Sequence, residues 1–251
     1  MDEDRKTSAK MCAITISREY GSGGGEIAAR LALRLGWELI DHEVVVRVAQ
    51  QLHVSQEEAE EHDERVESLA ARILKSLRLV QPTMPVAVEI PLTMDSRAFY
   101  EARSRVIEGA VASGQVVIVG RGAQAYLAKR RDVLHVRIVA PLEARLVYVM
   151  SREGLEREAA QARMLKKDQE HARYLEKFYH RHPSDPHLYD LVLNTGILDL
   201  ESVVEVIAIV LERKARRLSV PTRELGPAVG LPRYPAQPED FRPPQSMSPR
   251  K

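Results

Sequence analysis

The sequence predicts an α/β protein with a mostly parallel central sheet. Apolar, strand-like stretches alternate along the chain with stretches whose apolar residues recur at helical spacing, and parallel strands need such crossover helices between them. A cluster of glycines, GSGGG at 21–25, stands where the first strand-like stretch meets the first helix-like one. The 251 residues are enough for one sizeable domain with an inserted piece.

Two strand–helix units open the predicted domain. The apolar run MCAITI predicts a buried strand over 11–16, and GEIAARLALRLG predicts a helix that ends at Gly36. WELID predicts a second strand, which ends at Asp41. HEVVVRVAQQL then returns to helical spacing over 42–52.

Residues 53–95 are predicted to form an insertion between core elements. Ser55 followed by Glu58 is a capping-box pattern, which indicates that a long helix begins there. The acidic first half and basic second half of this stretch suit the two ends of a helix dipole. The proline-rich VQPTMPVAVEIPLT that follows cannot be regular helix and is interpreted as a connector.

The second half of the chain repeats the alternation and completes a domain predicted over 11–217. A helix over 96–112 precedes three further strands, which lie in VVIVG, VLHVRIVA and LYDLVLN. Pro141 opens the helix after the second of these strands. Residues 155–179 are highly charged and helical, and a helix over 200–217 closes the domain.

Composition excludes several classes of partner. The formal net charge of +1 gives no electrostatic case for binding nucleic acid or an anionic membrane surface. The single cysteine, Cys12, excludes an internal disulfide framework. The charged start MDEDRKTSAK lacks the apolar core of a signal peptide, so a cytoplasmic location is expected. The proline-rich residues 218–251 are predicted to be a disordered tail, and nothing in the sequence sets the oligomeric state.

The glycine cluster fits two nucleotide-binding patterns in part. Backbone N–H groups at a helix start can surround a phosphate, and glycines permit its close approach. The dinucleotide pattern G-x-G-x-x-G puts Glu26 at its third glycine. The phosphate-loop pattern G-x-x-x-x-G-K-[ST] keeps Gly23 as its second glycine. Arg18, Gly24 and Gly25 replace its first glycine, its lysine and its magnesium-binding hydroxyl. A loop without a ligand is the third interpretation, and spacing alone leaves all three open.

Further motifs carry a family resemblance. LALRLGWELID is followed by HEVVVRVA, which contains Arg47, and VVIVGRGA ends a strand in GR. An arginine-rich helix, REAAQARMLKKDQEHARYLEKFYHR, precedes the closing YDLVLNTGILDLESVVEVI. In this order the motifs resemble the P-loop nucleoside monophosphate kinases, and most closely the cytidylate kinase-like family. The resemblance covers roughly 14–210, with 55–93 matching least. One branch of that family opens like ISRxxGSGG, also without the lysine.

The resemblance implies a P-loop kinase fold of three layers, α/β/α, with a helical insertion at 53–95 and a helical lid at 154–182. It implies that ATP binds at the loop together with Mg²⁺, with the β-phosphate held by the backbone N–H groups of Gly21, Ser22, Gly23, Gly24 and Gly25. Arg18 is then the nearest candidate to replace the lysine. An ion pair of Arg18 with Glu19 or Glu26 is the equally open alternative.

The resemblance also implies an acceptor site. Arg47 and Arg121 would bind the acceptor phosphate, since a guanidinium can contact two phosphate oxygens at once. Asp41, at the end of a strand, would position the acceptor or a magnesium-bound water. Gly122 stands where family members often carry an acid that contacts the acceptor nucleoside, which leaves the choice of base open.

Lid residues would complete the site. Arg163 and Arg173 would close over the triphosphate and exclude water, and Asp168 would orient Arg173. The histidines near the end of this helix include the triplet HRH, which is not a zinc spacing, so no metal centre of protein ligands is predicted.

These features together predict an ATP-dependent nucleoside monophosphate kinase that acts on CMP or dCMP and gives the diphosphate and ADP. Small-molecule nucleotides are the expected partners. A kinase for another small acceptor is the first alternative, because Gly122 and the insertion depart from the family pattern. A nucleotide-binding regulator with little turnover is the second, because the lysine and the hydroxyl are absent.

Overall fold

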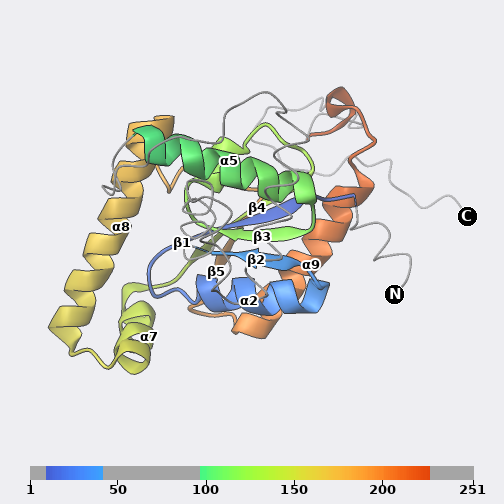
Figure 1. Ribbon diagram of the computed structural model, residues 1–251. Helices are drawn as coiled ribbons and strands as arrows, with labels where there is room; N and C mark the ends of the chain where they lie inside the picture. Colours follow the sequence, from blue (N-terminus) through green and yellow to red (C-terminus); the bar gives the residue numbers. More distant parts are fainter. Residues whose placement is uncertain (1–9, 42–96, 227–251) are drawn as a thin grey trace, which may run out of the picture.

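The central sheet of the computed structural model has five parallel strands in the order β2-β3-β1-β4-β5. The structure describes residues 10–41 and 97–226 (Figure 1). The strands are β1 (Ala13–Arg18), β2 (Glu38–Ile40), β3 (Val116–Val119), β4 (Val133–Val139) and β5 (Leu191–Asn194). Because all strands are parallel, their carboxyl ends share one edge of the sheet, where ligands of such folds bind.

Helices cover both faces of this sheet, as the α/β prediction requires. On one face α2 (Gly24–Leu35) and α9 (Leu200–Arg216) pack against the strands, and Ile14 and Ile16 of β1 belong to this core. On the other face α5 (Arg97–Ser113) and the short α6 (Ala123–Tyr126) form a second core with Ala13. Alternate side chains of β1 therefore point into the two cores. The predicted three-layer α/β/α fold is confirmed.

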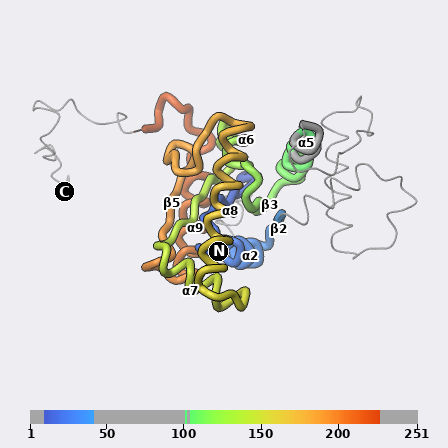
Figure 2. Tube along the Cα trace, turned by 90° about the vertical axis from the view of Figure 1, so that its left-hand side faces the viewer, coloured from blue at the N-terminus to red at the C-terminus, as the bar shows by residue number. Residues whose placement is uncertain are grey.

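Two helices stand at the carboxyl edge of the sheet. They are α7 (Leu142–Glu153) and the longer α8 (Arg157–Tyr179), which pack against each other. Figure 2 views the molecule from this side and shows both helices in front of the strands. The α8 helix falls within the segment predicted to be the lid, so the structure places that segment over the glycine loop. Two short 3₁₀ turns, Pro186–Leu188 and Thr222–Glu224, complete the described elements.

The predicted elements agree with the structure except at some boundaries. The first strand extends to Arg18 instead of ending at Ile16, because Ser17 and Arg18 continue the pairing with β4. The helix predicted over 42–52, which contains Arg47, and the insertion at 53–95 lie outside the described residues, as do residues 227–251 of the tail predicted from 218 onward. Residues 218–226 of that tail are described: they contain the turn Thr222–Glu224, and the carbonyl of Val220 accepts a hydrogen bond from Arg131 at 2.7 Å. No helix among the described elements combines the length and apolar character needed to cross a bilayer.

Candidate active site

The glycine loop follows β1 and leads into α2. Gly21 and Gly23 both adopt positive φ angles, +83° and +76°, which favour glycine. A Cβ at Gly21 would lie 2.8 Å from Val149 Cγ2, so the loop passes close to α7. No side chain of the described residues caps the start of α2. The first backbone N–H groups of this helix are therefore available to an anion.

Ser22 supports the shape of the loop from inside. Its side chain is buried, and its hydroxyl donates to the carbonyl of Glu19 at 2.8 Å. The hydroxyl of Thr195 in turn donates to the carbonyl of Ser22 at 2.9 Å. Ser22 thus fixes the loop from the protein side, and its backbone N–H already bonds Glu19. Of the loop residues expected to hold a phosphate, the glycines at the start of α2 are the better placed.

Arg18 occupies the place that the absent lysine would need. A Cβ added at Gly24, the lysine position of the pattern, would lie 2.6 Å from Arg18 Cβ and 3.0 Å from its Cγ. At the far end of the same side chain, Arg18 Nη1 would lie 2.0 Å from a Cβ at Gly120. The side chain therefore runs from the glycine loop to the turn after β3, and both glycines make room for it.

Arg18 does not form the ion pairs that the alternative interpretation required. Within the described residues no carboxylate lies within 4 Å of its guanidinium, because Glu19 pairs with Arg137 and Arg145. Glu26 pairs instead with arginines of α2 and α7. Burial lowers the pKa of Arg18, and Asp168 and Tyr20 oppose this shift from a distance. Arg18 is partly buried and has no close counter-charge among the described residues, so an anionic ligand would stabilise it.

Arg121 lies in the GRG turn and adds a second cation. It has a φ of +59°, between two glycines that also have positive φ. Burial, together with repulsion from Arg18, lowers the pKa of Arg121 to about 10, and the charge of Asp41 opposes the shift. The structure thus brings Arg18, Arg121 and Asp41 together at the carboxyl ends of three strands.

The second glycine of this turn is explained by packing against α8. A Cβ at Gly122 would lie 2.6 Å from the ring of Tyr179 and 3.0 Å from the ring of Tyr174. A side chain at this position would therefore collide with two aromatic rings of the lid segment. The space that an acid would occupy here is filled by tyrosines.

Two buried arginines that sequence reasoning missed hold the loop in place. Arg137 of β4 is 8 % exposed and donates to Ser17 Oγ at 3.3 Å, while Arg145 of α7 donates through Nε to the carbonyl of Tyr20 at 2.8 Å. Both also approach Glu19. A signal for each was present in the sequence: Arg137 interrupts an apolar strand, and Arg145 lies on the apolar face of its helix.

Asp168 has a different partner from the one predicted. Its carboxylate accepts a hydrogen bond from the backbone N–H of Tyr20 at 2.8 Å and pairs with Arg145. Within the described structure it makes no contact with Arg173, so the prediction that it orients Arg173 is corrected. Asp168 lies on the inner face of α8, where it fastens the lid segment to the glycine loop.

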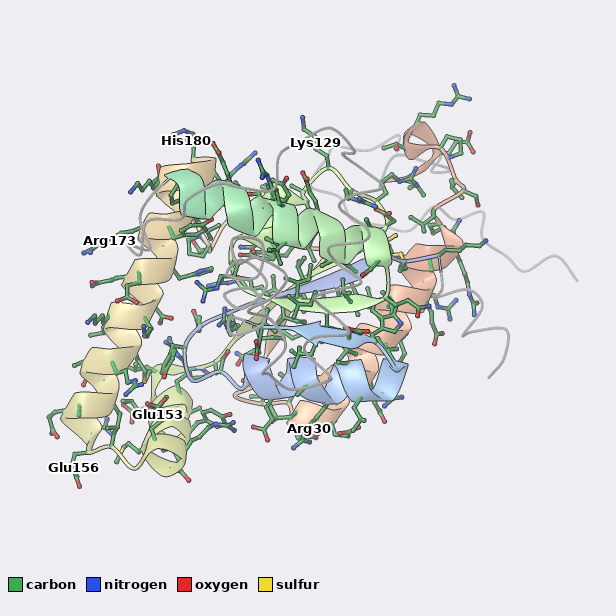
Figure 3. The ribbon with its side chains drawn as sticks, in the orientation of Figure 1. Arg30, Lys129, Glu153, Glu156, Arg173 and His180 are labelled. Carbon is green, nitrogen blue, oxygen red and sulfur yellow. The ribbon has the colours of Figure 1, made fainter. Side chains whose placement is uncertain are left out.

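The two predicted lid arginines lie on different sides of α8. Arg163 pairs with Glu153 at 3.0 Å, and Glu153 accepts a hydrogen bond from the hydroxyl of Tyr20 at 2.5 Å, so Arg163 is linked to the loop. Arg173 is exposed and points away from the sheet (Figure 3). The structure therefore brings Arg163 near the predicted site but not Arg173.

Polar side chains without partners complete the carboxyl edge. His171 extends from α8, and its Nε2 is buried without a hydrogen-bond partner in the described structure. Burial lowers the pKa of His171 to about 4, with Arg18 and Arg137 adding to the shift. Gln124 of α6 is fully buried, and neither side-chain atom has a partner there. Sequence reasoning missed both residues, and for Gln124 no local signal existed.

The fold and this site define a nucleotide-binding kinase: a P-loop type α/β/α domain with buried cations beside a glycine loop at the carboxyl edge. Comparison with known proteins agrees. The sequence model of the cytidylate kinase-like family matches residues 13–197 of this chain. The chain belongs to the cytidylate kinase-like family.

The chain is similar to several individual proteins, in sequence or in fold. A cytidylate kinase from Ignicoccus hospitalis is 29 % identical over 198 residues, which cover 78 % of this chain and 97 % of that protein. A uronate isomerase from Corynebacterium glutamicum is 32 % identical over 111 residues, which cover 44 % of this chain but 21 % of that enzyme. A solved structure of an uncharacterized protein from Eubacterium ventriosum has a TM-score of 0.59 and 20 % identity, and covers 80 % of this chain and 98 % of that one. This last likeness concerns the fold alone.

Proposed function

We propose that the protein transfers a phosphoryl group from ATP to a nucleoside monophosphate, CMP or dCMP, and releases the diphosphate and ADP. The observation that supports this most directly is the convergence of Arg18 and Arg121 beside the glycine loop, where Arg121 has a pKa lowered to about 10 by burial and by Arg18. Two mutually repelling, partly buried cations would be stabilised by an anion between them. A cytoplasmic location, which the sequence favours, would supply these nucleotides.

Each cation has a part in the proposed reaction. Phosphoryl transfer needs charge neutralisation and in-line positioning more than covalent help from the protein. The backbone N–H groups of Gly23, Gly24 and Gly25 hold the β-phosphate of ATP, and Arg18 neutralises its charge in place of the lysine. Arg121, together with Arg47, holds the phosphate of the acceptor. The developing negative charge then lies between fixed guanidinium groups.

Mg²⁺ enters this proposal with ATP. This ion is usually held by substrate phosphates, waters and one or two carboxylates. The described residues contain no group of three or more His, Cys, Asp or Glu that could form a cage for it. Asp41, whose charge acts on Arg121, is the carboxylate that would hold a water of the ion. This donor set fits an ion carried on the ATP phosphates, where it would withdraw charge from the transferred group.

The lid segment has two roles in the proposal. Asp168 is a positioning residue, because it fixes the backbone of Tyr20 and the side chain of Arg145 and thereby the start of the loop. Arg163 lies close enough to the loop to move onto the triphosphate when Glu153 releases it. Arg173 would reach the triphosphate after a rotation of α8.

Two alternatives follow from specific observations. A kinase for another small acceptor is favoured by Gly122, because tyrosine rings occupy the space next to it and leave no acid for the base. A nucleotide-binding regulator with little turnover is favoured by Gly25, since the loop there supplies no hydroxyl to Mg²⁺.

A panel of acceptors tests the proposal. The full-length protein is mixed with magnesium-ATP and, separately, CMP, dCMP, UMP, AMP, GMP or no acceptor, and ADP release is followed. Rapid ADP formation with CMP or dCMP is expected. ATP binding without acceptor-dependent ADP would favour the regulator, and turnover with none of these nucleotides but with another phosphate acceptor would favour the first alternative. Failure to bind ATP would overturn the assignment of the loop.

A further inference from the structure

A cavity lined by charged and apolar residues lies at the opposite, amino edge of the sheet. It has a volume of about 280 Å³, close to the lower end of ordinary ligand pockets at about 300 Å³. The segment before β4, the segment before β5 and the end of α9 form its walls, and residues of both signs line it: Lys129, Arg130, Arg131, His135, His187, Tyr189, Asp190, Lys214 and Arg217. None of these residues belongs to the candidate active site.

Positive charge in this cavity exceeds the negative charge. Asp190 neutralises Lys214 at 2.6 Å, and Asp132 neutralises Arg130 at 2.9 Å. For the other three cations, Lys129, Arg131 and Arg217, no carboxylate of the described residues lies within ion-pairing distance. Lys129 lines the cavity and points outward, away from the sheet (Figure 3). The cavity therefore presents three uncompensated cations around a space that can admit a small molecule.

Part of this arrangement is fixed before any ligand binds. Arg131 Nη2 donates to the carbonyls of Arg217 and Val220 at 2.9 and 2.7 Å, which holds its guanidinium in one place. This contact also ties the end of α9 to the segment before β4. A cation that is already positioned loses less conformational freedom on binding, and a fixed guanidinium suits the oxygens of a phosphate.

Neutral polar groups lie among these cations. His135 is 6 % exposed; its Nδ1 lies 2.8 Å from Thr15 Oγ1, and its Nε2 has no hydrogen-bond partner in the described structure. Burial lowers the pKa of His135 to about 4, so its ring is neutral near pH 7; the charge of Asp190 and, more weakly, the Leu127 backbone oppose the shift. The half-buried Tyr189 lies beside it on the cavity wall. The hydroxyl of Tyr189 already donates to the carbonyl of Pro183 and Nε2 of His135 is buried, so these two side chains offer a ligand a neutral surface.

From this geometry we propose that the cavity binds a small phosphorylated molecule whose phosphate is held by Arg131, Arg217 and Lys129. A phosphate monoester fits better than a single carboxylate, because it carries up to two charges and three acceptor oxygens for the cations to share. The body of the molecule lies against Tyr189 and His135. This site is separate from the glycine loop, and the proposal does not depend on the proposed kinase activity.

Amide chemical shifts locate the ligand directly. Full-length ¹⁵N-labelled protein is titrated with glucose 6-phosphate, with glucose as the uncharged control and citrate as a carboxylate. The amides of 128–131 and 188–190 are expected to shift with glucose 6-phosphate and not with glucose. Shifts confined to 20–25 and 120–122 would assign the phosphate to the active site and overturn the proposal, as would no shift at all. Tighter binding of citrate would overturn the assignment to phosphate.

A matched pair of substitutions tests the residues. Arg217→Gln removes a cation of the cavity, whereas Arg213→Gln removes an exposed cation of the same helix that does not line it. Arg217→Gln is expected to weaken glucose 6-phosphate binding about tenfold or more, the size of one charged hydrogen bond, and Arg213→Gln less than twofold. Lys129→Gln is a second variant on a different segment. Equal affinity in all three variants would overturn the site.

Discussion

The two edges of the sheet both collect positive charge, but they hold it differently. At the carboxyl edge Arg137 and Arg145 are each 8 % exposed, and Arg18 runs between backbone segments that contain glycine. At the amino edge Arg131 and Arg217 are exposed at the mouth of a cavity. The positions of the arginines at the carboxyl edge depend on how the backbone packs around them. The arginines at the amino edge are exposed, so they act mainly through their charge.

The difference has an energetic consequence. A buried cation is stable when hydrogen bonds or opposite charges compensate for lost solvation. Arg137 and Arg145 have Glu19 and several hydrogen bonds. Arg18 has no such close partner among the described residues, and its side chain passes close to Gly24 and Gly120. Substitutions at the carboxyl edge should therefore change stability and function together, and those at the amino edge should change ligand binding alone.

The largest effect is expected from restoring the lysine of the phosphate-loop pattern. In Gly24→Lys the new Cβ would lie 2.6 Å from Arg18 Cβ, and two side-chain stems near the backbone cannot easily move apart. We expect a loss of about 1–3 kcal/mol or more in the free energy of unfolding, with no gain in ADP release. Urea unfolding and the acceptor panel measure the two effects.

Gly25→Ala is the matched control for this substitution, because a Cβ at Gly25 meets nothing within 4 Å. Its free energy of unfolding should change by less than about 1 kcal/mol. A Gly24→Lys protein with full stability and faster turnover would contradict the assignment of this space to Arg18.

The next effect measures how much the position of Arg18 contributes to turnover, beyond the strain that a substituted glycine causes. In Gly120→Ala the new Cβ would lie 2.0 Å from Arg18 Nη1, the far end of a flexible side chain, so Arg18 should swing away instead of the fold failing. Gly114→Ala introduces a comparable positive-φ strain, at +74° against +71°, with nothing within 4 Å. Both variants should lose about 1–2 kcal/mol of stability. Gly120→Ala alone should lose about a hundredfold in kcat.

Equal kcat values in these two variants would mean that the position of Arg18 does not affect phosphoryl transfer. Titration with ATP analogues would then show whether Arg18 contributes to nucleotide binding alone.

A third effect, on stability alone, is expected where the lid segment is fastened to the loop. Asp168→Asn weakens the bonds to Tyr20 N–H and Arg145, and should lower the free energy of unfolding by about 1.5–3 kcal/mol. Glu170→Gln removes a pair with Lys167 on the exposed side of the same helix, which should cost about 0–1 kcal/mol. Thermal unfolding of both variants measures the difference. A similar loss in each would mean that Asp168 is not a positioning residue.

One histidine at each edge of the sheet allows the two edges to be compared through the pH dependence of the free energy of unfolding. His135 at the amino edge and His171 at the carboxyl edge each have a pKa lowered to about 4, mainly by burial. Between pH 6.5 and 4 the unfolded chain therefore binds more protons than the folded one. Stability from these neutral rings is fully present above about pH 6.5 and is lost as the pH falls towards 4.

Urea unfolding at pH 7 and pH 5 measures this loss for each histidine. His135→Gln and His171→Gln should each show a smaller difference between the two pH values than the parent protein, and the exposed His182→Gln should not. An unchanged difference in the His171 variant would mean that its ring is already protonated among the arginines at pH 5.

The particular residues show what sequence could and could not predict. Glycine clusters and apolar periodicity are local signals, so they predicted the order of strands and helices, and the glycine loop and Arg121 lie in the turns where the sequence placed them. Arg145, Gln124 and the partner of Asp168 depend on how distant segments pack. The Asp168–Arg173 prediction was wrong for a geometric reason: five residues along an α-helix turn the side chain by about 140°, so the two residues lie on different faces of α8.

The smallest effect is expected at Arg173. It tests whether α8 keeps its position or rotates when substrates bind. With α8 as described, Arg173 is exposed and points away from the site, so Arg173→Ala should change neither the free energy of unfolding nor the KM for the acceptor by a measurable amount. Arg121→Ala is the contrasting variant: it removes a cation close to Arg18 and should raise the acceptor KM about tenfold or more, as expected for loss of a charged hydrogen bond. An unchanged KM in Arg121→Ala would remove that residue from the site. If Arg173→Ala instead lowers kcat as strongly as Gly120→Ala, α8 must rotate when substrates bind. The contacts of Asp168 with the loop would then be those of a resting state that closure breaks.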